Sequence, residues 1–119
     1  MSCAYFNTFY NAQTYFELGI KDYRESLKKS NANFPKKNFD IAIQKAETVL
    51  LKYPDSKWCD DAQYLIAVSN FYKGNYRKAK KNIEDFFDTY PDSEFKNELD
   101  IWYGRIFWKT GSPEMAVHH

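Results

Sequence analysis

The side chains that could carry chemistry in this sequence are two cysteines, two histidines and two pairs of adjacent acids. His118 and His119 lie at the far end of the chain, so a histidine base oriented by a third group is hard to assemble. The sequence has no glycine-rich phosphate loop, no nucleophile elbow and no metal-ligand spacing. We therefore predict a protein that is not an enzyme and that has no cofactor and no metal site.

The acidic pairs and one of the cysteines favour structural roles. Asp60-Asp61 and Glu84-Asp85 are neighbours in sequence, and neighbours on a helix point to different sides, so we interpret them as caps and solvated charges. Cys59 lies between an aromatic residue and an acid, without a basic neighbour that would lower its pKa. A packed or bystander thiol is favoured over a nucleophile.

A repeated segment organises the rest of the chain. Tyr53–Ser56 reads Tyr-Pro-Asp-Ser and returns as Tyr90–Ser93, 37 residues later. The flanking residues match at the same offset, large apolar with large apolar, small with small and glycine with glycine: Phe39 with Tyr76, Ala42 with Ala79, Leu50 with Phe87, Trp58 with Phe95, Phe71 with Trp108, and Gly74 with Gly111. Self-similarity at a fixed period predicts stacked repeats, which act by presenting a surface.

Composition sets limits on that surface. The chain has 119 residues, enough for one domain, and aromatic residues make up 19% of it. Large planar side chains fill gaps between crossing helices and also anchor binding surfaces. The formal net charge of +1 gives no argument for nucleic acid, and no apolar run is long enough to span a membrane.

Periodicity predicts an all-α fold of antiparallel helix-turn-helix pairs, with about two and a half repeats in a single domain over residues 1–119. Apolar residues at three- and four-residue steps predict helices over residues 4–30, 38–52, 57–73, 76–89 and 94–110. The units are then a long N-terminal helix with its loop (4–37), a helix with its joint (38–56), a full repeat (57–93) and a repeat that breaks off (94–117).

The first helix carries more aromatic residues than one buried face requires. Its predicted core stripe is Phe6, Phe9, Ala12, Phe16, Ile20, Tyr23 and Leu27. Tyr5, Tyr10 and Tyr15 lie off that stripe. Either the stack wraps this helix, or its outer face is meant for a partner.

The joints have local explanations. The residue before a proline avoids helical geometry, so Tyr53 should be the last of its helix. Asp55 or Ser56 can cap the next helix, and Gly74 stands where a helix end favours positive φ.

The segment Gly74-x-Tyr76-x-x-Ala79, with Pro91 twelve residues after the alanine, resembles the tetratricopeptide repeat. That repeat implies a right-handed solenoid. Its usual period is 34, and the three extra residues here fall at the Tyr-Pro-Asp-Ser joint. The longer joint is similar to that of outer-membrane assembly lipoproteins of the BamD type and related periplasmic repeat proteins.

The N-terminus resembles the mature start of a bacterial lipoprotein in that group, because Cys3 is followed at once by an aromatic helix. The resemblance implies lipidation of Cys3, which would be the chain's membrane attachment, and a location in the bacterial cell envelope at the periplasmic face of the outer membrane. The sequence departs from the pattern in having no apolar segment ahead of Cys3. An incidental thiol and a cytoplasmic location stay open.

Stacked helix pairs leave a concave face built mostly from the first helix of each pair. Candidate partner-binding residues there are Gln63, Tyr64, Asn70, Asp100, Trp102 and Tyr103. Trp102 or Tyr103 could equally be core residues at the next helix interface. They would suit an extended peptide or a helix in a groove. We expect a non-catalytic scaffold whose partner is a protein or peptide, with outer-membrane assembly components as the implied class. The alternatives are a subunit that self-associates by head-to-tail stacking and a soluble adaptor.

Overall fold

The computed structural model describes residues 3–29 and 36–111. Over these residues it contains five helices, which are α1 (Cys3–Lys28), α2 (Lys37–Lys52), α3 (Cys59–Tyr72), α4 (Tyr76–Thr89) and α5 (Lys96–Thr110), and no strand. Successive helices pack against each other, with α1 also touching α3 and α3 touching α5. The predicted all-α repeat fold is confirmed.

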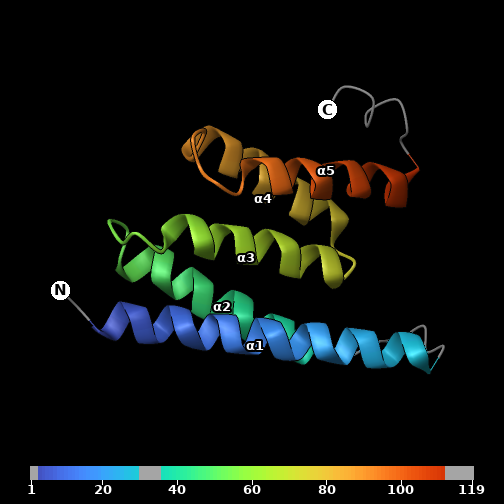
Figure 1. Ribbon diagram of the computed structural model, residues 1–119, viewed down its shortest axis with the longest axis horizontal. Coiled ribbons are helices and arrows are strands. Elements are labelled where there is room, and N and C mark those ends of the chain that lie inside the picture. The colour runs from blue at the N-terminus through green and yellow to red at the C-terminus, as the bar shows by residue number, and fades with distance from the viewer. Residues whose placement is uncertain (1–2, 30–35, 112–119) are drawn as a thin grey trace.

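The helices form two layers (Figure 1). One layer holds α1, α3 and α5, which run side by side in the same direction, and the second holds α2 and α4, which run the opposite way. Because the first helix of each pair lies in one layer, a single broad face of the molecule is built from α1, α3 and α5.

The two joints have the same geometry. Tyr53 and Tyr90 end their helices at φ −132°, ψ 58° and φ −128°, ψ 61°. In the first joint the Ser56 hydroxyl accepts the Trp58 N–H at 3.0 Å, and in the second the Ser93 hydroxyl accepts the Phe95 N–H at 3.2 Å. The recurring tetrapeptide is therefore one structural unit used twice.

These serines explain two errors in the predicted boundaries. Helices expected to start at residues 57 and 94 start at Cys59 and Lys96. The serine hydroxyl holds the N–H two residues on in a turn, so the first helical residue comes later. The end at Gly111 follows the expected pattern, since this residue takes φ 75°, as Gly74 takes φ 83°.

The core is formed where the layers meet. One cluster joins α1, α2 and α3, and a second joins α3, α4 and α5. The ring of Phe16 packs against both clusters, which makes the buried interior continuous along the stack.

The predicted stripe of α1 is wrong at its C-terminal end. Leu27 is 58% exposed, whereas Gly19 and Ser26 are buried. The inward positions from Phe9 onward therefore follow alternating steps of three and four residues, a period of 3.5. That period is typical of helices that pack along one another, and α1 packs against α2. Phe6 lies among the residues whose side chains are outside the described set.

Candidate functional site

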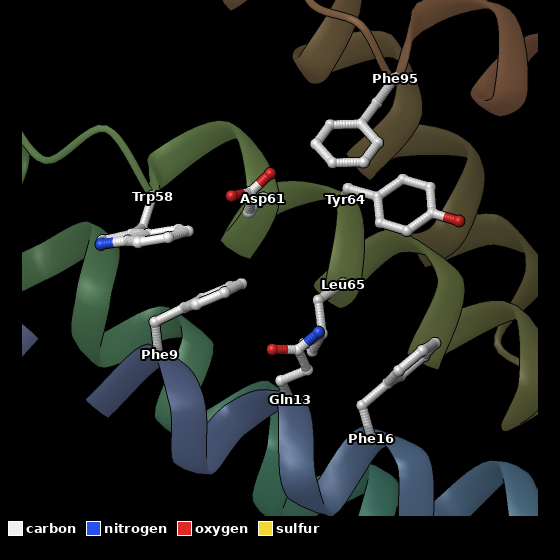
Figure 2. Close-up of a pocket in the computed structure, with 8 residues that line it drawn as sticks. All are labelled: Phe9, Gln13, Phe16, Trp58, Asp61, Tyr64, Leu65 and Phe95. Carbon is white, nitrogen blue, oxygen red and sulfur yellow. The ribbon is translucent and has the colours of Figure 1, made fainter. Parts of the chain in front are cut away.

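A pocket lies on the face made by α1, α3 and α5, with a volume of about 250 Å³. Figure 2 shows its eight lining residues. They come from α1, from α3 and from the two joints, which are the segments 53–58 and 90–95 between helices: Phe9, Gln13, Phe16, Trp58, Asp61, Tyr64, Leu65 and Phe95. We call this the aromatic pocket.

Two ring stacks set the walls of the aromatic pocket. Phe9 and Trp58 stack with centroids 5.1 Å apart and planes 13° apart. Tyr64 and Phe95 stack at 4.6 Å and 19°. Each pair joins a helix of the layer to a joint residue, and Trp58 and Phe95 are equivalent positions of the repeat. One aromatic position of the repeat therefore contributes a ring to each wall.

Asp61 is the acid of the pocket. Its carboxyl group lies between Trp58 and the Tyr64–Phe95 stack (Figure 2). Burial, with Asp60 and Glu94 nearby, raises the pKa of Asp61 to about 6. With the other residues that the structure describes, this carboxylate forms no hydrogen bond or ion pair.

The neighbouring acids differ because each has a partner. Asp60 accepts the Asp61 N–H at 2.9 Å and the Ser93 hydroxyl at 2.9 Å. Glu98 accepts the hydroxyl of Tyr64, and burial together with this hydrogen bond raises the pKa of that tyrosine. Asp60 thus ties the second joint to α3, and Glu98 ties α5 to α3.

A second hollow of about 440 Å³ lies toward the other end of α3, and we call it the basic hollow. Its residues are Tyr23, Phe71, Tyr72, Trp102, Arg105, Trp108 and Lys109. Trp102 meets Phe71 edge-on at 4.9 Å, and the Arg105 guanidinium lies 4.7 Å from the Trp102 ring. The charged residues that line this hollow, Arg105 and Lys109, are basic. The charged residue that lines the aromatic pocket, Asp61, is acidic.

A family model described as outer membrane lipoprotein, YfiO, matches residues 20–105. The chain belongs to the YfiO family of outer membrane lipoproteins. No curated protein and no solved structure matches it. Membership indicates the cell envelope as the location and agrees with the resemblance to BamD-type proteins.

The YfiO match runs from the middle of α1 into α5, so it includes both joints and all of α3. The matched segment begins after the part of α1 that lines the aromatic pocket, which is Phe9, Gln13 and Phe16. Cys3 precedes it as well; α1 begins at this residue, whose side chain is outside the described set. Lipidation of Cys3 stays a prediction.

The candidate partner-binding residues fall in different places. Tyr64 lines the aromatic pocket and Trp102 lines the basic hollow. Gln63 and Asp100 are half-buried, at equivalent positions of α3 and α5. The partner-binding role of these four residues stays a prediction.

The expectation that Asn70 lies on the exposed face is wrong, since this residue is buried. Tyr103 is buried as well, which agrees with the core position left open for it. The Asn70 amide donates to Asn82 Oδ1 at 2.7 Å, and the Tyr103 hydroxyl donates to Glu84 Oε2 at 2.5 Å. Polar side chains suggest a surface, but each finds its partner on α4, which lets it enter the interior.

Sequence reasoning assigns most residues of the aromatic pocket to other roles. Phe9 and Phe16 are expected in the core, and Asp61 has the pattern of a helix-end charge. The equivalence of Trp58 and Phe95 is visible as one aromatic position in two repeats. What the pattern does not reveal is that α1 also lines the pocket, because α1 lies outside the 37-residue repeat.

The thiol of Cys59 is buried, as expected for a packed cysteine. It donates to the Tyr53 carbonyl at 3.2 Å, and burial raises its pKa, so the thiol stays neutral at physiological pH. Within residues 3–29 and 36–111 there is no cluster of histidine, cysteine or acidic side chains suited to a metal ion. No helix of that part is long and apolar enough to span a membrane. His118 and His119 lie outside the described residues.

Proposed function

We propose that this protein is a non-catalytic, lipid-anchored scaffold that binds a protein segment on its α1/α3/α5 face and helps to assemble or organise outer-membrane components. The observation that carries the proposal is the aromatic pocket, together with the basic hollow on the same face. Rings held by stacking lose little freedom when they bind a partner, which makes them good anchors.

The two hollows favour an extended segment as the occupant. One lies near the start of α3 and is acidic; the other lies near its end and is basic. A peptide that lies along α3 reaches both hollows. A basic side chain at one of its ends would then meet the acidic pocket, and an acidic side chain at the other would meet the basic hollow. Membership of an outer membrane lipoprotein family supports an envelope protein as the source of that segment.

A lipid on Cys3 would hold the start of α1 at the membrane, because α1 begins at that residue. The test is the intact mass of the protein expressed from its complete native gene and recovered from membranes. We expect signal removal and acyl chains on Cys3, and a Cys3→Ser variant that leaves the membrane fraction. An unmodified soluble protein would overturn the anchor.

Site-specific photo-crosslinking in cells tests the scaffold. A photoreactive residue at Gln13, at the edge of the aromatic pocket, should crosslink to outer-membrane assembly proteins identified by mass spectrometry. The matched control is Gln44, an exposed glutamine of α2 in the other layer. The same products from both positions, or none from Gln13, would contradict a binding role for the face.

One observation favours self-association as a second candidate. Ile101 and Trp108 of α5 are 60% and 74% exposed, while their equivalents in α3, Tyr64 and Phe71, pack against α5 and its joint. The outer face of α5 thus repeats a surface that α3 uses for stacking. Sedimentation decides between the candidates. A monomer at high concentration contradicts self-association, whereas a dimer that dissociates in the Trp108→Ser variant supports it.

A further inference from the structure

We infer that the aromatic pocket receives an arginine side chain of the bound segment, with the guanidinium paired to the Asp61 carboxylate. This deepens the proposed function and rests on it. The inference comes from three features of the described residues: an acid to which no described side chain donates, walls that suit a planar cation, and a space of the right size.

Asp61 is the acid of the pocket that has no hydrogen-bond donor or cation among the described residues. Asp60 beside it accepts two hydrogen bonds, and Glu98 of α5 accepts one from Tyr64. A half-buried carboxylate without a donor is costly, and a partner's cation would remove that cost. The structural roles of Asp60 and Glu98 leave Asp61 as the group available for binding.

The walls favour a guanidinium over other cations. A guanidinium is planar, stacks on aromatic faces and donates two parallel hydrogen bonds to one carboxylate. An ammonium is more strongly hydrated and gains less from aromatic walls. The protein already shows the preferred geometry, since the Arg105 guanidinium lies over Trp102 in the basic hollow.

The size of the space suits one side chain. About 250 Å³ lies below the range of roughly 300–1,000 Å³ that is typical of sites for whole small molecules. The apolar stem of an arginine can lie along Phe16 and Leu65 while its head reaches Asp61.

The surrounding charges agree with a cationic ligand. Asp60 on α3 and Glu94 at the second joint both raise the pKa of Asp61, and Glu98 stands on α5 beside Tyr64. The residues that α1 contributes to the lining are Phe9, Gln13 and Phe16, which carry no charge. Lys57 is the nearby cation of the first joint, with its amine 5.0 Å from the Trp58 ring.

The test uses the 119-residue protein and the peptide acetyl-Ser-Arg-Ser-amide, with its citrulline twin as the neutral isostere and its lysine twin as the second cation. Binding is followed by NMR through the indole N–H of Trp58 and the backbone amide of Asp61, with the Trp108 indole as an internal control. We expect saturable shifts at Trp58 and Asp61 from the arginine peptide at low-millimolar concentration, weaker ones from the lysine peptide and none from the citrulline peptide.

Two variants separate the pocket acid from general charge. Asp61→Asn should weaken binding of the arginine peptide by roughly ten-fold, which is the loss typical of one charge-assisted hydrogen-bonded pair. Asp88→Asn removes the same charge from an exposed position on α4 and should leave binding unchanged. For the parent protein, binding should strengthen by about ten-fold between pH 5 and pH 7.5 as Asp61 ionises, and this dependence should vanish in Asp61→Asn.

The inference is overturned if the citrulline or lysine peptide binds as well as the arginine peptide, if no shift occurs at Trp58, or if Asp61→Asn binds like the parent. These outcomes leave the proposed function standing when Gln13 still crosslinks to an envelope protein. Conversely, a positive peptide result with no crosslink at Gln13 would count against the scaffold and not against the pocket.

Discussion

Gly19 of α1 lies directly against the ring of Phe39 of α2. A Cβ added to Gly19 would come within 2.8 Å of Phe39 Cδ1 and Cε1. The ring cannot retreat, because it is fully buried, stacks on Tyr72 at 5.5 Å and meets Phe16 edge-on at 6.1 Å. The absent side chain lets α1 approach α2 closely at this point, and Tyr72 of α3 packs on the same ring.

We predict that Gly19→Ala destabilises the protein by about 1–3 kcal/mol, the usual cost of overpacking, although alanine is the better helix former. Gly104→Ala is the matched control, because a Cβ on Gly104 of α5 meets nothing within 4 Å. That change should stabilise the protein by about 0.5–1 kcal/mol. Chemical denaturation measures both, and equal effects of the two substitutions would contradict the close contact.

The Gly19 contact marks the limit of sequence reasoning for this helix. The helical character of α1 follows from its apolar periodicity, but the choice between Ile20 and Gly19 as the inward position does not. Ile20 is the more apolar residue, yet the 3.5-residue period imposed by α2 turns Gly19 inward. The partner helix decides the face, and a single-helix pattern carries no information about the partner's angle.

Ser93 should matter more than Ser56. Both hydroxyls accept the N–H two residues on, and Ser93 also donates to Asp60. We predict that Ser56→Ala costs about 1 kcal/mol and Ser93→Ala about 2 kcal/mol, since the second change also strips a donor from a half-buried carboxylate. Double-mutant cycles with Asp60→Asn check the cause, because the coupling energy should be measurable for Ser93 and near zero for Ser56.

The buried hydroxyl of Tyr103 gives a prediction with a pH signature. Hydrogen bonds from Lys80 and then from Tyr103 hold the pKa of Glu84 below its ordinary value of 4.5. Glu84 therefore adds stability that is present above about pH 4.5 and is lost as pH falls through its folded pKa. Tyr103→Phe should cost about 1 kcal/mol at pH 7 and make the acid-side loss shallower.

The control for Tyr103 is Tyr64→Phe, which removes a hydroxyl bonded to Glu98 at an exposed site. Its effect on stability should be smaller, because water can replace that hydrogen bond. Denaturation curves for both variants at a series of pH values give the comparison. An unchanged pH profile in Tyr103→Phe would show that Lys80 alone sets the pKa of Glu84.

Much of the candidate site follows from the repeat, and part of it does not. The joints recur in sequence, so the 37-residue offset alone places Trp58 and Phe95 at equivalent points. Asn70 is misplaced by sequence reasoning because its partner Asn82 lies twelve residues away on the next helix, and pairing of polar groups leaves no periodic signal. Asp61 has the pattern of a helix-end charge because it lies in the first turn of α3. The acid beside it, Asp60, does serve the fold, and nothing in the sequence separates the two.

Asp61→Asn should stabilise the free protein at neutral pH. The pKa of Asp61 is about 6 in the folded state against an ordinary value of 3.8, so the folded state binds the proton more tightly. A raised folded pKa gives stability that is complete below about pH 3.8 and falls as pH rises toward 6. The carboxyl group is only partly buried and solvent screens its charge, so we expect a gain of about 1 kcal/mol at pH 7.5.

The neighbouring acid is the control, and it should respond with the opposite sign. Asp60→Asn weakens the hydrogen bonds from Ser93 and from the Asp61 N–H, so it should destabilise the protein at pH 7.5. Free energies of unfolding for the parent and both variants at pH 4 and pH 7.5 provide the measurement. If Asp61→Asn destabilises, or if its difference from the parent is the same at both pH values, the cost assigned to the Asp61 carboxylate is contradicted. If Asp61→Asn raises the free energy of unfolding and also weakens binding of the arginine peptide, the Asp61 carboxylate destabilises the free protein and a bound cation removes that destabilisation. This combination is expected of a residue whose role is binding.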